Sequence, residues 1–272
     1  MLLTISNFEN LICLTIPYIP YTVYPYPLYL FPSLIMKLLR EKQFWVLLLL
    51  SGFVRIYVWY VTPVVGRDGL DFINIAKNFS GDNFYKGLEH AFHPLYSLFI
   101  SWCSISGIGF VSSGRIVSLV FGILAVIAVY VIGKKMFNPT IAFLSSFLLA
   151  VHPYAVRLSV DVMSDSTYYF FYILGFGFGY VAINSKKQRF FLFAGMTASL
   201  AYLTRPEGVS VLLLTAVWTV IKTATGFLPR GTQIPFLKLQ TKEWDSIPIK
   251  DSIKALSFLL IGFLIFAFPY IG

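Results

Sequence analysis

Apolar runs close to 20 residues long recur along the chain and alternate with short clusters of basic residues. A helix of about 20 apolar residues crosses the roughly 30 Å hydrocarbon core of a bilayer. The pattern predicts an all-α membrane protein, a polytopic helical bundle over residues 44–272. The predicted crossings are residues 44–62, 113–133, 139–157, 166–184, 190–205, 207–223 and 253–271.

Residues 1–43 read as a separate, Pro-rich and basic cytoplasmic segment. Five prolines interrupt its apolar stretch, so no continuous helix could satisfy the backbone there. A signal peptide would begin with basic residues and end at a small-residue cleavage site, and neither feature is present. The basic residues that directly follow Met36 favour translation starting at that methionine.

Segment 94–111 is apolar but contains several serines and glycines, and its placement decides the orientation of the chain. If it lies on the surface or re-enters the membrane, about 14 of the 21 basic residues fall on the cytoplasmic side. If it crosses, only about six do, which contradicts the positive-inside rule. We therefore interpret residues 94–111 as interfacial or re-entrant.

This orientation places most carboxylates on the extracytoplasmic side. They are Asp68, Asp71, Asp82, Glu89, Asp161, Asp165 and Glu207. The first outer loop, residues 63–112, is long for a polytopic protein, and loops of that length are usually functional. We therefore expect the chemistry at the outer face.

Composition narrows the class of protein further. The chain is 57% hydrophobic and 12% charged, with a mean hydropathy of +0.76, whereas about a quarter of the residues in a soluble domain are charged. The net charge of +9 lies in short loops between apolar runs rather than on one soluble face. This distribution excludes nucleic acid as a partner and makes membrane lipids the surroundings of the chain.

Residues 68–79 have the pattern of an amphipathic helix in the interface plane. Phe72, Ile73, Ala76 and Phe79 share one face, and Asp71 lies on the other. Asp68 stands at the helix start, where a carboxylate caps the helix and interacts favourably with its positive end. The alternative is a catalytic base that takes a proton from an incoming hydroxyl or amine, and the two roles are compatible.

Arg205-Pro206-Glu207-Gly208 separates two apolar runs at the outer boundary. Arginine binds phosphate through paired N–H donors, so Arg205 is a candidate for phosphate recognition. A helix-ending turn with a local Arg–Glu pair explains the same four residues equally well. Arg55, inside the first apolar run, is a weaker candidate for the same site.

Two further carboxylates, Asp161 and Asp165, follow the His152-Pro153 dipeptide. They either complete a site with Asp68 or cap the helix that begins near Ser166. His90 and His93 lack the further ligands of a zinc site, and Pro94 at a helix start accounts for the local sequence.

Gly175, Gly177 and Gly179 lie inside a predicted span. A nucleotide-binding loop would need a preceding strand, so we expect these glycines to allow close packing of helices.

Short motifs follow one another in a characteristic order. They are Arg67-Asp68-Gly69, His93-Pro94-Leu95-Tyr96, Arg115 at the start of a run, Gly133-Lys134-Lys135-Met136-Phe137, the stretch from His152-Pro153 to Asp165, and Thr204-Arg205-Pro206-Glu207-Gly208. In this order they resemble the membrane-embedded glycosyltransferases of the GT-C fold, especially the protein mannosyltransferase and aminoarabinose-transferase type of family 39. The resemblance covers about residues 44–271.

The resemblance implies a sugar donor linked to polyprenyl phosphate, transfer on the extracytoplasmic side and an acid in the first outer loop acting as base. Asp68 matches that base. We expect the remaining outer residues to bind substrate, namely Asp71, His93, Asp161, Asp165, Arg205 and Glu207. Many family members have Asp-Glu where this chain has Asp68-Gly69, so no metal ligands are assigned, although a divalent cation is compatible with the site.

The expected partners are the lipid-linked donor, a lipid, glycan or protein acceptor, and the lipids of a prokaryotic inner membrane. The family usually has about twice this length, so the resemblance implies that residues 1–272 are an N-terminal portion. Two other functions stay open at this point. A transporter or lipid flippase should show internal repeats, and none is evident, whereas in a membrane scaffold the acidic loop would only cap helices.

Overall fold

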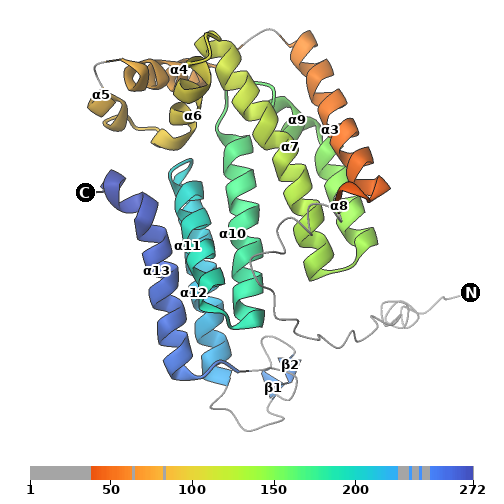
Figure 1. Ribbon diagram of the computed structural model, residues 1–272, viewed down its shortest axis with the longest axis vertical. Helices are drawn as coiled ribbons and strands as arrows, with labels where there is room; N and C mark the ends of the chain where they lie inside the picture. The colour runs from red at the N-terminus through yellow and green to blue at the C-terminus, as the bar shows by residue number, and fades with distance from the viewer. Residues whose placement is uncertain are drawn as a thin grey trace, which may run out of the picture. The chain divides into compact units, whose positions relative to one another are not determined.

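The computed structural model describes residues 38–62, 65–81, 84–225, 233–234, 239–240 and 246–271 (Figure 1). The helices are α3 (Lys42–Val61), α4 (Arg67–Ser80), α5 (Phe84–Leu88), α6 (Pro94–Ser104), α7 (Phe110–Met136), α8 (Pro139–Val151), α9 (Pro153–Leu158), α10 (Asp165–Ser185), α11 (Gln188–Tyr202), the 3-10 helix η2 (Pro206–Gly208), α12 (Val209–Ala224) and α13 (Ile249–Ile271). Strands β1 (Gln233–Ile234) and β2 (Leu239–Gln240) form a short antiparallel pair. Residues 1–37 of the predicted segment 1–43, including Met36, lie outside the described residues. Asp82 also lies outside them.

Five helical segments among the described residues are long and apolar enough to cross a membrane. They are α3, α7, α10, η2 with α12, and α13. Helices α8 and α11 occupy the other two predicted spans but have 13 and 15 residues. At 1.5 Å per residue these helices measure about 20 and 22 Å, less than the roughly 30 Å hydrocarbon core. The prediction of an all-α membrane protein is confirmed, and two of the seven predicted spans are shorter than a full crossing.

The predicted span 139–157 is broken at His152 into α8 and α9. A residue before proline is disfavoured in the helical conformation, and His152 is extended, with φ −62° and ψ 117°. Its Nδ1 accepts a hydrogen bond from the amide of Ala155 at 3.3 Å and caps α9. The short helix α9 therefore turns away from α8.

Segment 94–111 does not form one continuous helix. Helix α6 begins at Pro94, ends at Ser104, and is about 16 Å long, too short to cross a bilayer. The turn after it contains Gly107 at φ +82°, a left-handed conformation that glycine adopts without strain. Helix α7 starts at Phe110.

Helix α10 lies between two groups of helices and contacts α7 on one side and α11 and α12 on the other (Figure 1). Its glycines make these contacts close. A Cβ atom added at Gly177 would lie 2.6 Å from Ile132 of α7, and one at Gly179 would lie 2.6 Å from Thr215 of α12. The prediction that the glycines permit close helix packing is confirmed.

The apolar face of α4 is as predicted, but its surroundings are not. Phe72, Ile73, Ala76 and Phe79 are buried, and the face packs on α6 and α7 instead of lying against lipid. The rings of Phe72 and Tyr96 meet edge to face at 5.0 Å. The sequence pattern identifies an apolar face, but the same pattern fits a lipid or a protein neighbour.

The ends of the bundle differ in charge, as the alternation of runs and clusters predicts. Helices α4, α5, α6 and α9, the start of α10 and η2 share the upper end in Figure 1, and these elements contain Asp68, Asp71, Asp165 and Glu207. The ends of α7, α10 and α12 and the starts of α3, α8, α11 and α13 share the other end. There Lys134 at the end of α7 pairs with Glu41, which precedes α3.

Candidate functional site

A cavity of about 490 Å³ opens at the carboxylate-bearing end of the bundle. It brings together five of the seven residues that the sequence nominates, drawn from α4, the start of α6, the start of α10 and the η2 turn. They are Asp68, His93, Asp165, Arg205 and Glu207. Residues far apart in the chain therefore converge on one site.

Asp68 lies in the first turn of α4 and is exposed. The N-cap residue of α4 is Gly66, so Asp68 does not occupy the capping position. The positive end of the helix dipole stabilises a carboxylate in this turn. An exposed carboxylate at a cavity is suited to accept a proton from a bound hydroxyl or amine.

Asp161 and Gly69 position the start of α4. Both carboxylate oxygens of Asp161 accept from the amide of Gly66, at 3.3 and 3.2 Å, and one also accepts from the amide of Val162 at 2.7 Å. A Cβ at Gly69 would lie 2.7 Å from the side chain of Val65 and 3.0 Å from the carbonyl oxygen of Val162. A glutamate therefore does not fit at position 69 without displacing α4.

These contacts give Asp161 a structural role at the start of α4. It does not line the cavity, and it does not cap α10, whose N-cap residue is Ser164. Its carboxylate accepts hydrogen bonds from backbone amides, and these bonds join the start of α4 to the segment before α10. Asp71 also lies outside the cavity lining.

Arg205 joins two carboxylates. Its Nη1 contacts Asp165 and its Nε lies 3.6 Å from Glu207. The side chain of Asp165 is 13% exposed and that of Arg205 is 36% exposed. The local Arg–Glu pair expected for a turn is present, and the contact with Asp165 connects that turn to α10. The two contacts use two of the three guanidinium nitrogens, which leaves the N–H donors of Nη2 for a ligand.

His93 occupies the N-cap position of α6, and its ring packs on Tyr202 and Tyr270, with centroid distances of 4.9 and 5.5 Å. Its Nδ1 is buried and has no hydrogen-bond partner within the described parts of the chain. Burial lowers the pKa of His93 below 6.5, and the nearby carboxylate of Glu207 opposes this shift. The imidazole is therefore neutral at pH 7 and offers one donor and one acceptor.

The described residues contain no group of three or more His, Cys, Asp or Glu side chains that could hold a metal ion. His90 accepts a hydrogen bond from the amide of Phe92 at 3.4 Å and stacks on its ring. We therefore assign no step to a metal ion.

Two arginines outside the cavity hold the framework together. Arg55 is 1% exposed, and its Nη1 donates to Ser51 Oγ at 2.8 Å and to the carbonyl of Ala150 at 3.1 Å, so the suggestion that Arg55 belongs to the site is wrong. Arg115 donates to the carbonyls of Trp59, Thr62 and Val160, at 3.0, 2.6 and 2.7 Å. It therefore connects the end of α3 to the segment before α10.

Sequence reasoning missed several residues that line the cavity. They are Phe72, Ala91, Phe92, Tyr154, Leu158, Met163, Ser164, Thr204 and Pro206. Tyr154 directly follows His152-Pro153, and Thr204 directly precedes Arg205. Their position beside these motifs could have identified both as candidate lining residues. Nothing in the sequence pattern distinguishes the apolar lining residues from core residues.

Comparison with known proteins identifies a family. The family model for dolichyl-phosphate-mannose-protein mannosyltransferase matches residues 93–239, just over half of the chain. The matched range begins at His93 and includes Asp165, Arg205 and Glu207, whereas Asp68 precedes it. No curated protein and no solved structure matches the chain.

Proposed function

The chain belongs to the dolichyl-phosphate-mannose-protein mannosyltransferase family, and from this membership we propose the reaction, the donor and the base. The protein is an integral membrane glycosyltransferase. We propose that it moves a sugar from a polyprenyl-phosphate donor to a lipid, glycan or protein acceptor at the extracytoplasmic face of a prokaryotic inner membrane. The basic clusters at the end opposite the cavity support this orientation under the positive-inside rule.

One observation carries the proposal: Asp68 and Arg205 line the same cavity. In the proposed reaction the acceptor oxygen or nitrogen attacks the anomeric carbon and its proton passes to Asp68. The bond from that carbon to the phosphate oxygen breaks, and polyprenyl phosphate leaves. The carboxylate in the first turn of α4 is suited to this role because it is exposed and lines the cavity.

Arg205 is proposed to hold the donor phosphate. The described lining of the cavity has three carboxylates, Asp68, Asp165 and Glu207, and Arg205 is the single Lys or Arg in it. Phosphate binding therefore depends on this guanidinium, whose Nη2 donors are suited to phosphate oxygens. The contacts with Asp165 and Glu207 hold the guanidinium in place before the donor arrives.

A pair of substitutions on one helix tests the role of Asp68. We expect Asp68→Asn to lower transfer of radiolabelled sugar from a polyprenyl phosphate in proteoliposomes by about 10²- to 10⁴-fold, the usual contribution of a general base. Asp71→Asn is the matched control, because it removes one carboxylate from the same helix outside the cavity lining. We expect its rate to stay within about twofold of the unsubstituted protein. Transfer that survives Asp68→Asn unchanged excludes the proposed base.

A further inference from the structure

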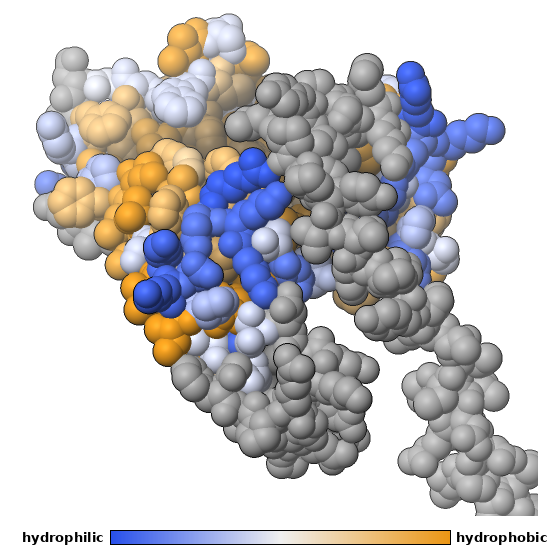
Figure 2. All heavy atoms as spheres, turned by 60° about the horizontal axis from the view of Figure 1, so that its bottom comes forward, coloured by the Kyte–Doolittle hydropathy of each residue, from blue (hydrophilic) through white to orange (hydrophobic). Residues whose placement is uncertain are grey.

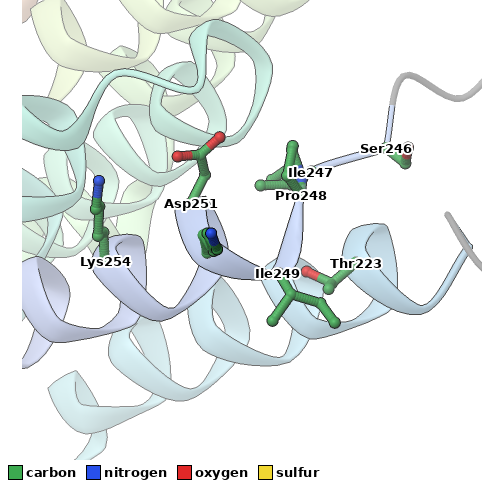
Figure 3. A pocket seen from close by; sticks show the side chains of 8 residues that line it. Thr223, Ser246, Ile247, Pro248, Ile249, Asp251 and Lys254 are labelled. Atoms are coloured by element: carbon green, nitrogen blue, oxygen red, sulfur yellow. The ribbon is translucent and has the colours of Figure 1, made fainter.

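A second cavity, of about 540 Å³, lies at the opposite end of the bundle, where the last turn of α12 meets the start of α13 (Figure 3). Residues 246–251, Thr223 and Lys254 line it. Thr223 and Ser252 share a hydrogen bond between their hydroxyls, and the amide of Ile247 donates to the carbonyl of Lys222 at 3.4 Å. The two helix ends that frame the cavity are therefore held together.

The surroundings of this cavity are strongly basic. Lys250 and Lys254 are exposed and lie one helical turn apart on α13, as neighbours on the helix surface. Lys186, Lys187 and Lys222 lie at the adjoining ends of α10, α11 and α12, and Lys186 Nζ donates to the carbonyl of Ser246 at 2.9 Å.

Acidic residues are few in the described parts of this end. Within residues 183–190, 219–225 and 246–256, all of them described, Asp251 is the single acidic residue. Figure 2 shows hydrophilic side chains gathered over this end of helices α10 to α13, with hydrophobic surface beside them. Basic side chains outnumber acidic ones in these described ranges, which favours a negatively charged ligand.

The helices beside the cavity expose apolar side chains. Ile253 of α13 is 61% exposed and lies three residues beyond Lys250, and Val220 of α12 is 53% exposed and lies three residues before Thr223. Both helices are long and apolar enough to cross a membrane, which suits these exposed side chains to contact with acyl chains. A membrane phospholipid combines an anionic headgroup with apolar chains in this arrangement.

We propose that the cavity at the junction of α12 and α13 binds an anionic phospholipid, with its phosphate at Lys250 and Lys254 and its acyl chains along the exposed faces of both helices. Basic side chains next to a membrane helix attract anionic headgroups, by about fivefold in affinity for each Lys or Arg. The site is separate from the carboxylate-lined cavity and does not depend on the proposed transferase reaction.

Lipid titration of the purified protein, followed by native mass spectrometry, tests the site. We expect dioleoyl-phosphatidylglycerol to bind more tightly than dioleoyl-phosphatidylcholine, and Lys250→Gln/Lys254→Gln to weaken phosphatidylglycerol binding by about 25-fold. The control Lys77→Gln/Lys86→Gln removes two exposed lysines of α4 and α5 at the other end of the bundle and should change affinity by less than about twofold. Lys250→Arg/Lys254→Arg keeps the charge and should keep the binding.

Two results overturn the proposal. Equal loss of binding in the two glutamine pairs shows attraction by net charge alone, and retained binding in Lys250→Gln/Lys254→Gln excludes the site. Soluble glycerol 3-phosphate distinguishes a lipid from a free phosphate compound. We expect it to displace little phosphatidylglycerol at equal concentration, and effective displacement shows a site for a soluble anion instead.

Discussion

Gly208 positions the Arg205–Glu207 turn against the end of α11, and its replacement by alanine tests that packing. Gly208 has φ −58° and ψ −25°, which alanine adopts equally well, so the substitution introduces no backbone strain. A Cβ at this position would lie 2.7 Å from the carbonyl oxygen of Ala201 and closer still to the carbonyl carbon of Ala201 and the amide nitrogen of Tyr202. The conflict is therefore with main-chain atoms of α11.

The size of the effect follows from these distances. Ordinary van der Waals contact begins at 3.4 Å, so the turn must move about 0.7 Å from the Ala201 oxygen, and further from the two nearer atoms. Overpacking usually costs about 1–3 kcal/mol, and we expect the upper end because backbone atoms cannot rotate away as a side chain can. Since Arg205 and Glu207 lie in this turn, we also expect sugar transfer to fall.

Unfolding of the purified protein in detergent, titrated with a denaturing detergent, measures the loss of stability. Gly52→Ala is the matched control, because Gly52 lies inside α3 and a Cβ there would meet Ile123 at an ordinary 4.0 Å. Alanine is favoured over glycine in a helix, so this variant should be as stable as the unsubstituted protein or slightly more stable. A free energy of unfolding for Gly208→Ala within about 0.5 kcal/mol of the control refutes the described packing.

Three further predictions concern the candidate site and its support. Arg205→Lys should raise KM for the polyprenyl-phosphate donor about tenfold in steady-state transfer assays, because one ammonium cannot replace a guanidinium fork, and an unchanged KM contradicts donor binding there. Asp161→Asn should lower the free energy of unfolding by about 1–2 kcal/mol, because a charged acceptor of the Gly66 amide is lost; chemical denaturation measures it. Burial lowers the pKa of His93 below 6.5, so the unfolded chain binds more protons just below that pH and stability falls as the pH decreases through this window. Unfolding temperatures from pH 5 to 7.5 should show this decrease, and His93→Gln should remove part of it.

The site could be predicted to the extent that polar residues interrupt apolar runs. Asp68, His93, Asp165, Arg205 and Glu207 stand at such interruptions, and the structure brings them together. The same reasoning nominated Asp161, which also lies at an interruption. Its carboxylate, however, accepts hydrogen bonds from backbone amides. A sequence pattern does not distinguish a carboxylate that faces a cavity from one that holds a loop.

Close contacts between segments that are distant in the chain could not be predicted from the sequence either. Glycine at position 69 is required because the backbone of Val162 passes beside it, and Val162 is distant in the chain. The burial of Arg55 depends on the end of α8, which turns at His152 and offers the carbonyl of Ala150. Each contact joins elements whose relative position depends on the packing of the whole bundle.

The sequence by itself determined the helical membrane class, the approximate positions of the long apolar helices and the separation of acidic from basic ends. The reason is that a hydrocarbon core accepts only apolar helical runs with satisfied backbone groups, and this constraint is local to each run. The tertiary structure alone decided which side chains share a cavity and that α4 packs its apolar face on α6. Those outcomes depend on shape complementarity between distant segments, which no run of residues specifies for itself.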